Sequence, residues 1–314
     1  MSHRYYAFGQ IIDSDVRLDE LSTVPVPSAA QPIRIRHADV GVELLPFGAA
    51  PAIMDYDHPD GVLMAWHGVC AVLVKDSRTV LVQPHPDVAE HYLAFPLLGP
   101  VMGWVLDQCG YLVLHASAVD FGGRTFAFLG DKGAGKSTTA AACLNAGAKL
   151  VTDDLLVIDC GHADGSEVGA GAPRVHTAFA QVKLNEASSD ASTIRGAVSK
   201  PLVFEGFPKR QFQIEGTADP VVPCDVICVL RRTDGPFSVD WLSATACLGH
   251  LFRYAYNIRF DGVPDRYRNA SRHFRNCARL ADTARIGVVH MPHDMERLPQ
   301  SIAALRALAE KPPS

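Results

Sequence analysis

The alternation of apolar and polar runs predicts a β-rich beginning for this chain. Residues 5–12, 33–45, 64–74 and 79–82 have the apolar and β-branched content of strands. The last two runs are separated by the polar turn Lys75-Asp76-Ser77-Arg78, which predicts a hairpin. Residues 1–86 are therefore expected to form a small β-rich N-terminal unit.

After residue 86 the pattern changes to a mixture of helices and strands. Residues 87–109 predict a helical stretch that Pro96 and Pro100 interrupt. Further strands are expected at residues 111–119, 124–129, 149–152, 155–158, 225–232 and 286–291, and helices at residues 138–146, 244–258 and 301–310. Residues 87–314 are expected to form a second, larger α/β domain.

One strand-to-helix connection of this domain carries a phosphate-binding motif. It reads Gly130-Asp131-Lys132-Gly133-Ala134-Gly135-Lys136-Ser137, with Thr138 directly after it, and fits the P-loop pattern G-x-x-x-x-G-K-[ST]. A short apolar strand precedes it, and an Ala-rich helix closed by Gly147 follows it, which is the context the motif requires. The alternative is a glycine-rich turn that binds nothing.

The residue types of the motif suit a triphosphate. Its glycines let several backbone N–H groups point at one anion, beside the positive end of the helix dipole. Lys136 would supply a mobile cation for the outer phosphates, and the Ser137 hydroxyl would be a ligand of Mg²⁺. We therefore expect residues 130–138 to bind a nucleoside triphosphate with Mg²⁺, and the sequence leaves the choice between ATP and GTP open.

Two neighbouring carboxylates follow the motif. Asp153 and Asp154 are expected at a strand end, where a Mg²⁺ ligand and a base would be needed, and a polar β-turn is the alternative.

Upstream of the glycine motif, the short turn Asp120-Phe121-Gly122-Gly123 joins two strands. An antiparallel hairpin is thus expected to lead into the loop, whereas most P-loop proteins enter it from a parallel sheet.

In combination, Leu114-His115, the glycine motif and Leu150-Val151-Thr152-Asp153-Asp154 resemble the catalytic domain of HPr kinase/phosphorylase. That family is distantly similar to phosphoenolpyruvate carboxykinase. Residues 6–15 are also similar to the divergent HPr-kinase-related group, which includes kinases that modify lasso-peptide precursors. The resemblance implies an α/β P-loop kinase core with a mixed sheet in residues 87–314.

The resemblance also implies roles by position. Asp153 would accept the proton of a serine hydroxyl, and Lys136 would stabilise charge on the transferring phosphoryl group. His115 would lie near the terminal phosphate, although a histidine in an apolar strand is also typical of a protein core. Asp154 and Ser137 would hold Mg²⁺.

Two departures from the family restrict the expected activity. Thr138 stands where the bifunctional enzymes carry Glu, and the sequence lacks their Glu-Ile-Arg-Gly-Leu-Gly segment. The expectation is an ATP- and Mg²⁺-dependent serine kinase without phosphorylase activity, acting on a peptide or small protein of the lasso-peptide precursor type. A kinase of a small metabolite and a nucleotide-binding regulatory switch are the alternatives.

Further cations are candidates for phosphate or substrate contacts. Arg174, Lys183 and residues 209–212 are similar to segments near the phosphates in the family, with a solvated surface as the alternative. Eight arginines from Arg253 to Arg285 predict either an exposed helix face or a patch for an acidic peptide or a phosphate.

The amino-acid composition narrows the possible classes of protein and of partner, and it indicates no further function. The 314 residues are 48% hydrophobic and 20% charged with a net charge of −5, which allows a large core and argues against a general nucleic-acid binder. The longest apolar stretch, residues 94–106, is too short for a membrane span, and no secretory signal is apparent. The eight cysteines lack C-x-x-C spacing, and Cys224 and Cys228 are expected as core thiols. We expect a cytoplasmic protein without nucleic-acid or membrane partners, and the sequence leaves homo-oligomerisation open.

Overall fold

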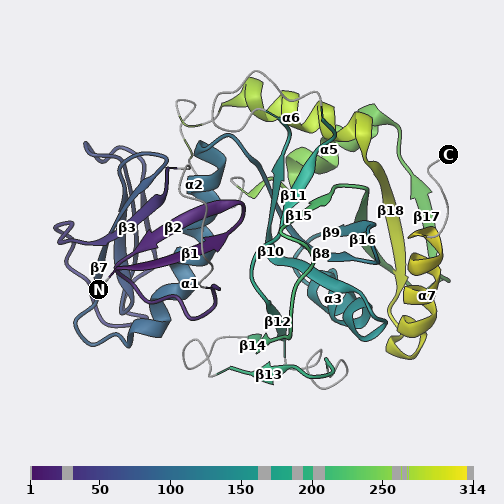
Figure 1. Ribbon diagram of the computed structural model, residues 1–314, viewed down its shortest axis with the longest axis horizontal. Coiled ribbons are helices and arrows are strands. Elements are labelled where there is room, and N and C mark those ends of the chain that lie inside the picture. The colour runs from purple at the N-terminus through teal and green to yellow at the C-terminus, as the bar shows by residue number, and fades with distance from the viewer. Residues whose placement is uncertain are drawn as a thin grey trace. The chain divides into compact units, whose positions relative to one another are not determined.

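The structure, a computed structural model, is that of a mixed α/β protein with several mixed sheets. It describes residues 2–22, 31–161, 171–185, 194–200, 209–256, 263, 267 and 269–309. The chain divides into two compact units, drawn in Figure 1: residues 1–111 with 257–270, and residues 112–256 with 271–314. In this division, residues 87–111 and 257–270, both within the expected second domain, are grouped with the first unit.

The first unit is built on one sheet with the strand order β1-β2-β3-β7-β6-β5-β4. The strands are β1 (His3–Ala7), β2 (Gln10–Ser14), β3 (Ile33–His37), β4 (Ile53–Asp55), β5 (Val62–Trp66), β6 (Cys70–Val74) and β7 (Thr79–Pro84). β3 is parallel to β2 and β7, and the other pairs are antiparallel. The hairpin expected around residues 75–78 is β6–β7 and is confirmed.

Three strands expected in this unit are wrong in extent. The run 5–12 is a hairpin, because Phe8 (φ 55°) and Gly9 (φ 71°) form a left-handed two-residue turn. The run 33–45 is a strand only as far as His37, and a turn containing Gly68 (φ 74°) splits the run 64–74 into β5 and β6. Apolar content alone does not show these turns, since the residues on both sides of each turn are apolar.

A broken helical segment completes the first unit. A 3-10 turn (Glu90–Leu93), α1 (Ala94–Pro96), a π-helical turn (Leu97–Val101) and α2 (Met102–Gln108) follow one another. The interruption expected at the prolines is confirmed, since Pro100 lies inside the π-helical turn. Trp104 is buried with its ring 5.6 Å from that of Tyr56, so this segment packs against the β-rich part of the first unit.

The second unit is centred on a mixed sheet with the strand order β15-β11-β10-β8-β9-β16-β18-β17. The strands are β8 (Leu112–Asp120), β9 (Thr125–Leu129), β10 (Lys149–Asp159), β11 (Arg174–His176), β15 (Val221–Pro223), β16 (Val226–Thr233), β17 (Ser238–Trp241) and β18 (Arg285–Pro292). β16 is parallel to β9 and β18, and β8 is antiparallel to β9 and β10. The expected hairpin that leads into the glycine motif is β8–β9 and is confirmed.

Helices cover both faces of this sheet (Figure 1). They are α3 (Lys136–Asn145), α5 (Ala244–Arg253), α6 (Ala270–Thr283) and α7 (Leu298–Ala309). Leu251 of α5 and Leu280 of α6 belong to one buried cluster, whereas Ala140 of α3 and Leu305 of α7 belong to the cluster on the opposite face. We call this second face the α3 face. Among the described helices, none combines the length and the apolar character needed to cross a membrane.

A small antiparallel sheet lies beside α3. It consists of β12 (Gln181–Asn185), β14 (Lys209–Gln213) and β13 (Val198–Ser199), in that spatial order. Val182 and Leu184 of β12 share a buried cluster with Ala141 of α3 and Leu150 of β10. This packing fixes Lys183, between those two β12 residues, next to the carboxylate pair.

Candidate functional site

The glycine loop, residues 130–137, connects β9 to α3, as expected from the sequence. Its three glycines have positive φ values, 154° at Gly130, 86° at Gly133 and 95° at Gly135. Gly135 is the residue immediately before the helix. The loop therefore adopts a backbone path that other residue types follow only with strain, which explains the glycines of the motif.

Backbone donors of this loop are available to a ligand. The N–H groups of Lys132, Gly133, Gly135 and Ser137 donate no hydrogen bond to any residue that the structure describes. The loop is exposed or half-buried at these positions, so an incoming anion can reach them. Four such donors beside the N-terminus of a ten-residue helix fit an anion such as a phosphate chain.

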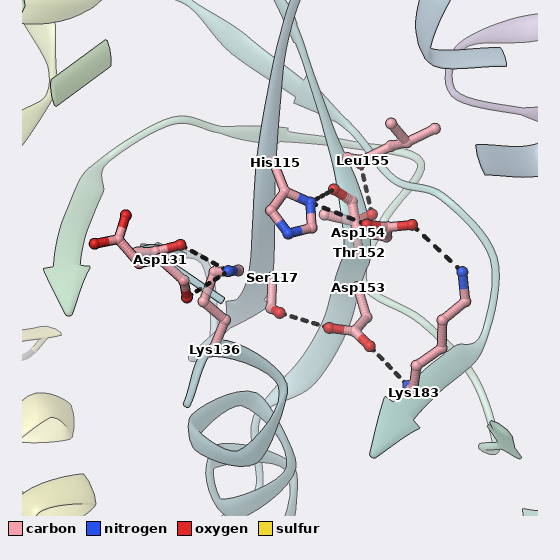
Figure 2. Close-up of polar contacts among 10 residues, drawn as sticks. His115, Ser117, Asp131, Lys136, Thr152, Asp153, Asp154, Leu155 and Lys183 are labelled. Atoms are coloured by element: carbon pink, nitrogen blue, oxygen red, sulfur yellow. Dashed lines mark hydrogen bonds and ion pairs between the residues drawn. The ribbon is translucent and has the colours of Figure 1, made fainter. Parts of the chain in front are cut away.

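Lys136 places its ammonium group at the mouth of this loop. Its Nζ donates to the carbonyl oxygen of Gly130 at 2.7 Å and to that of Asp131 at 3.3 Å (Figure 2). The Asp131 carboxylate in turn accepts from Arg253 Nη2 at 2.8 Å and from the Tyr254 hydroxyl at 3.4 Å. The end of α5 thus contacts the loop, a contact that the sequence did not reveal.

The carboxylate pair lies inside a strand and not at a strand end. β10 extends from Lys149 to Asp159, with a register shift against β8 between Leu150 and Thr152, and Asp153 and Asp154 pair with Ser117 and Ala116 of β8. The expectation of a strand end is therefore wrong. The alternative of a polar β-turn is wrong as well, because both residues keep their pairing with β8.

An unusual backbone angle brings both carboxylates to one face. Consecutive strand residues normally point to opposite faces of a sheet. Asp154 has a φ of 128°, a value that residues with a Cβ rarely adopt. Its carboxylate meets His115 and that of Asp153 meets Ser117, and these two β8 residues point to the same face because they are two positions apart.

Asp153 is held by two hydrogen bonds. Its Oδ1 accepts from the Ser117 hydroxyl at 2.5 Å and its Oδ2 accepts from the backbone N–H of Lys183 at 2.7 Å. The residue is 8% exposed and Ser117 is 1% exposed. A carboxylate has about four acceptor positions, so two remain for a further donor.

Asp154 is held by two cationic or potentially cationic side chains, as Figure 2 shows. Its Oδ1 lies 3.0 Å from His115 Nδ1, and its Oδ2 lies 3.4 Å from Lys183 Nζ. Lys183 therefore contacts both members of the pair, one through its backbone and the other through its side chain. The structure brings together His115, Asp153, Asp154 and Lys183, all four of which the sequence singled out.

The pair and the glycine loop belong to the same region of the sheet. Asp153 lies opposite Ser117, and Ser117 lies opposite Phe128, two residues before the loop begins at Gly130. Two strand spacings of about 4.8 Å each separate β10 from β9. Phe128 belongs to the buried cluster of the α3 face, so the Ser117 and Asp153 side chains lie on the face that the loop's own helix covers.

Other candidates lie elsewhere. Arg174 pairs with Asp159 near the far end of β10 and is exposed, so it does not join the carboxylate pair. Lys209–Gln213 is strand β14, whose Gln211 pairs with Lys183. Of the arginine-rich stretch, Arg253 contacts the glycine loop, Arg272, Arg275 and Arg279 lie on α6, and Arg259, Arg266 and Arg268 fall outside the described residues.

Ser117 is a site residue that sequence reasoning missed. The signal was present, since Ser117 is two positions after His115 in a strand pattern and must share its face. Polar residues with that spacing in an otherwise apolar strand indicate a polar face at that point.

Ser137 and Asp154 are the residues that the sequence marks as Mg²⁺ ligands. Among the described residues, no group of three or more His, Cys, Asp or Glu side chains is arranged to hold a metal ion. Mg²⁺ at a nucleotide site needs one or two protein oxygens, with phosphates and water as the other ligands. Ser137 carries a hydroxyl oxygen and Asp154 carries carboxylate oxygens, and protein oxygens of both types can bind Mg²⁺.

Comparisons with known proteins give no family. No family model matches the chain, and no curated protein matches it by sequence. Among solved structures, the chain is similar to the HPr(Ser) kinase/phosphatase from Coxiella burnetii, with a TM-score of 0.29 and 10% identity, over 63% of this chain and 92% of that one. A TM-score and an identity this low assign neither a family nor an activity to this chain.

Proposed function

We propose that this protein is an ATP- and Mg²⁺-dependent kinase that phosphorylates a serine hydroxyl. The observation that carries the proposal is the juxtaposition of two chemistries on the α3 face. One is Lys136 with a glycine loop that has N–H groups unpaired within the described residues, and the other is a carboxylate pair two strands away, of which Asp153 is buried and Asp154 is half-buried. A phosphotransferase needs an anion cradle and an acceptor base within reach of each other.

Each group of residues has its own role in the proposed phosphoryl transfer. The glycine loop binds and orients the phosphate chain, and Lys136 stabilises charge on the transferring group. Asp153 accepts the proton of the acceptor hydroxyl at one of its two remaining acceptor positions, while Ser117 and Lys183 hold its carboxylate still. Asp154 and Ser137 would hold Mg²⁺, which neutralises phosphate charge when bound.

The acceptor class is inferred from the sequence motifs. The His115, glycine-motif and Asp-Asp arrangement resembles HPr-kinase-type enzymes, which supports a serine on a peptide or small protein as acceptor. Thr138 in place of Glu supports transfer without the reverse phosphorolysis. A lasso-peptide precursor is the substrate type that we propose within this class.

The decisive experiment is transfer of labelled phosphate from Mg²⁺-ATP to a panel of serine-containing peptides and HPr. Asp153→Asn should abolish labelling and retain nucleotide binding. Asp159→Asn, at the other end of the same strand, is the matched control and should remain active. Wild-type protein that binds nucleotide without labelling any acceptor, and an Asp153→Asn variant with the same behaviour, would favour a nucleotide-dependent switch instead.

A further inference from the structure

A half-buried arginine lies against the glycine loop. β16 runs parallel to β9 with Val229 opposite Leu129, so the residues after Val229 continue alongside the loop. Arg231 and Arg232 occupy this end of β16. Leu230 belongs to the cluster of the α3 face and Val229 to the opposite cluster, so by alternation Arg232 lies on the α3 face and Arg231 does not.

The Arg232 guanidinium touches the loop at Gly135. A Cβ placed on Gly135 would come within 2.2 Å of Arg232 Nη2 and 3.0 Å of its Cζ. On its other side, Arg232 Nη1 donates to the carbonyl oxygen of Pro292 in β18 at 3.0 Å. The arginine is therefore fixed between a neighbouring strand and the residue that precedes α3.

This cation has no anionic partner among the described residues. The structure gives Arg232 a backbone carbonyl as its hydrogen-bond partner and no ion pair with any described carboxylate. Its surroundings exclude part of the solvent, and burial lowers the pKa of Arg232. Guanidinium groups that lose water are ordinarily paired with an anion. The N–H group of Gly135, which the guanidinium adjoins, has no partner among the described residues and can donate to the same anion.

We infer that Arg232 is a phosphate-binding residue that completes the glycine loop with a second, rigidly held cation. Lys136 reaches the phosphates on a flexible stem, whereas Arg232 is anchored on Pro292 and presents a planar edge. The contact also gives Gly135 a second reason to be glycine, besides its φ of 95°. The inference rests on the proposed function, since it assigns this arginine to the same phosphate chain.

Arg231 is a matched control in the same strand. It carries the same charge, is exposed, and its side chain makes no hydrogen bond or ion pair within the described part of the chain. Arg231→Gln and Arg232→Gln therefore remove the same charge from adjacent positions. Only the second removes a guanidinium that touches the loop.

Titration calorimetry of the full chain with Mg²⁺-ATP, Mg²⁺-ADP and inorganic tripolyphosphate tests the inference. Arg232→Gln should weaken binding of all three by about tenfold or more, the scale of a lost charge-assisted hydrogen bond, whereas Arg231→Gln should change it by less than about threefold. Arg232→Lys, which keeps the charge without the forked geometry, should fall between Arg232→Gln and wild type. Thermal unfolding without nucleotide identifies a variant that does not fold, in which case the Arg232→Lys result decides.

Two results would overturn the inference alone. The first is wild-type affinity in Arg232→Gln, or in Arg232→Lys where Arg232→Gln does not fold. The second is an equal loss of affinity in the Arg231→Gln and Arg232→Gln variants. Wild-type protein that binds none of the three probes would instead overturn the proposed function, and the two failures are therefore distinguishable.

Discussion

Ser117 and Asp153 face each other across the β8–β10 pair, with the serine hydroxyl 2.5 Å from the carboxylate. Both are buried, so removing the hydroxyl leaves a carboxylate oxygen with one fewer donor and no ready access to water. We expect Ser117→Ala to lower the free energy of unfolding by about 1–3 kcal/mol, measured by urea denaturation.

Ser301→Ala is the control for that loss. Ser301 is also buried, but its hydroxyl donates to the backbone carbonyl of Arg297 rather than to a charged group. Its replacement should cost less than Ser117→Ala. Equal costs at the two positions would show that the contact with Asp153 contributes nothing special to stability.

The positive φ of Asp154 predicts a difference between two substitutions that both remove its carboxylate. Glycine adopts a φ of 128° without strain, whereas alanine does not. Asp154→Gly should therefore be more stable than Asp154→Ala by about 1 kcal/mol, judged by thermal or urea unfolding. Both variants should lose transfer activity, and an alanine variant as stable as the glycine variant would contradict the strain argument.

Lys136 and Lys132 provide a test of which loop cation serves the phosphates. Lys136 Nζ is held at the mouth of the loop, whereas Lys132 is exposed and not needed by the motif. Lys136→Ala should weaken Mg²⁺-ATP binding roughly 10- to 100-fold, measured by calorimetry, and Lys132→Ala should change it far less. A larger effect at Lys132 would refute the assignment.

The eight cysteines should be inert in the folded protein. All are buried and unpaired with one another, and burial raises the pKa of Cys70, Cys160, Cys228 and Cys277 to about 12. Because the thiolate is the reactive form, Ellman's reagent at pH 8 should label almost none of them until denaturant is added. Rapid labelling of native protein would contradict this burial.

His273 should make stability fall in mild acid. Burial lowers the pKa of His273 below its ordinary value of 6.5, so the unfolded chain binds that proton more tightly than the folded chain. The free energy of unfolding is unaffected above pH 6.5 and decreases below it, by at most about 1.4 kcal/mol per pH unit for one group.

Replacement by phenylalanine isolates this contribution. His273→Phe keeps an aromatic ring beside Phe252, whose ring centroid is 5.3 Å away, and removes the titrating group. The unfolding midpoint of this variant should vary less between pH 7.5 and 5.0 than that of wild type. A pH dependence in His273→Phe equal to that of wild type would contradict this assignment.

The sequence predicted the elements that carry the site, because their signals are local. The strand–glycine loop–helix order, the hairpin before it and the identity of Asp153 and Asp154 were all readable from short segments. The position of the pair within β10 was not readable, because it depends on the φ of Asp154 and on continued pairing with β8.

Long-range contacts could not be predicted in the same way. Arg232 meets Gly135 because β16 is inserted next to β9, and Arg253 meets Asp131 because α5 ends beside the loop. These residues are about 100 positions from the motif, and no local pattern records which strand or helix lies beside it. The φ-positive turn at Phe8 was missed for the related reason that its flanking residues are equally apolar.

Residues 257–270 are grouped with the first unit, and this grouping affects how the chain can be divided into fragments. The chain passes between the units after residues 111, 256 and 270, so neither unit is a continuous piece of polypeptide. A fragment that begins at Leu112 would carry residues 257–270 without the unit to which they belong. Cutting the chain at one peptide bond therefore cannot yield the two units as separate, complete pieces.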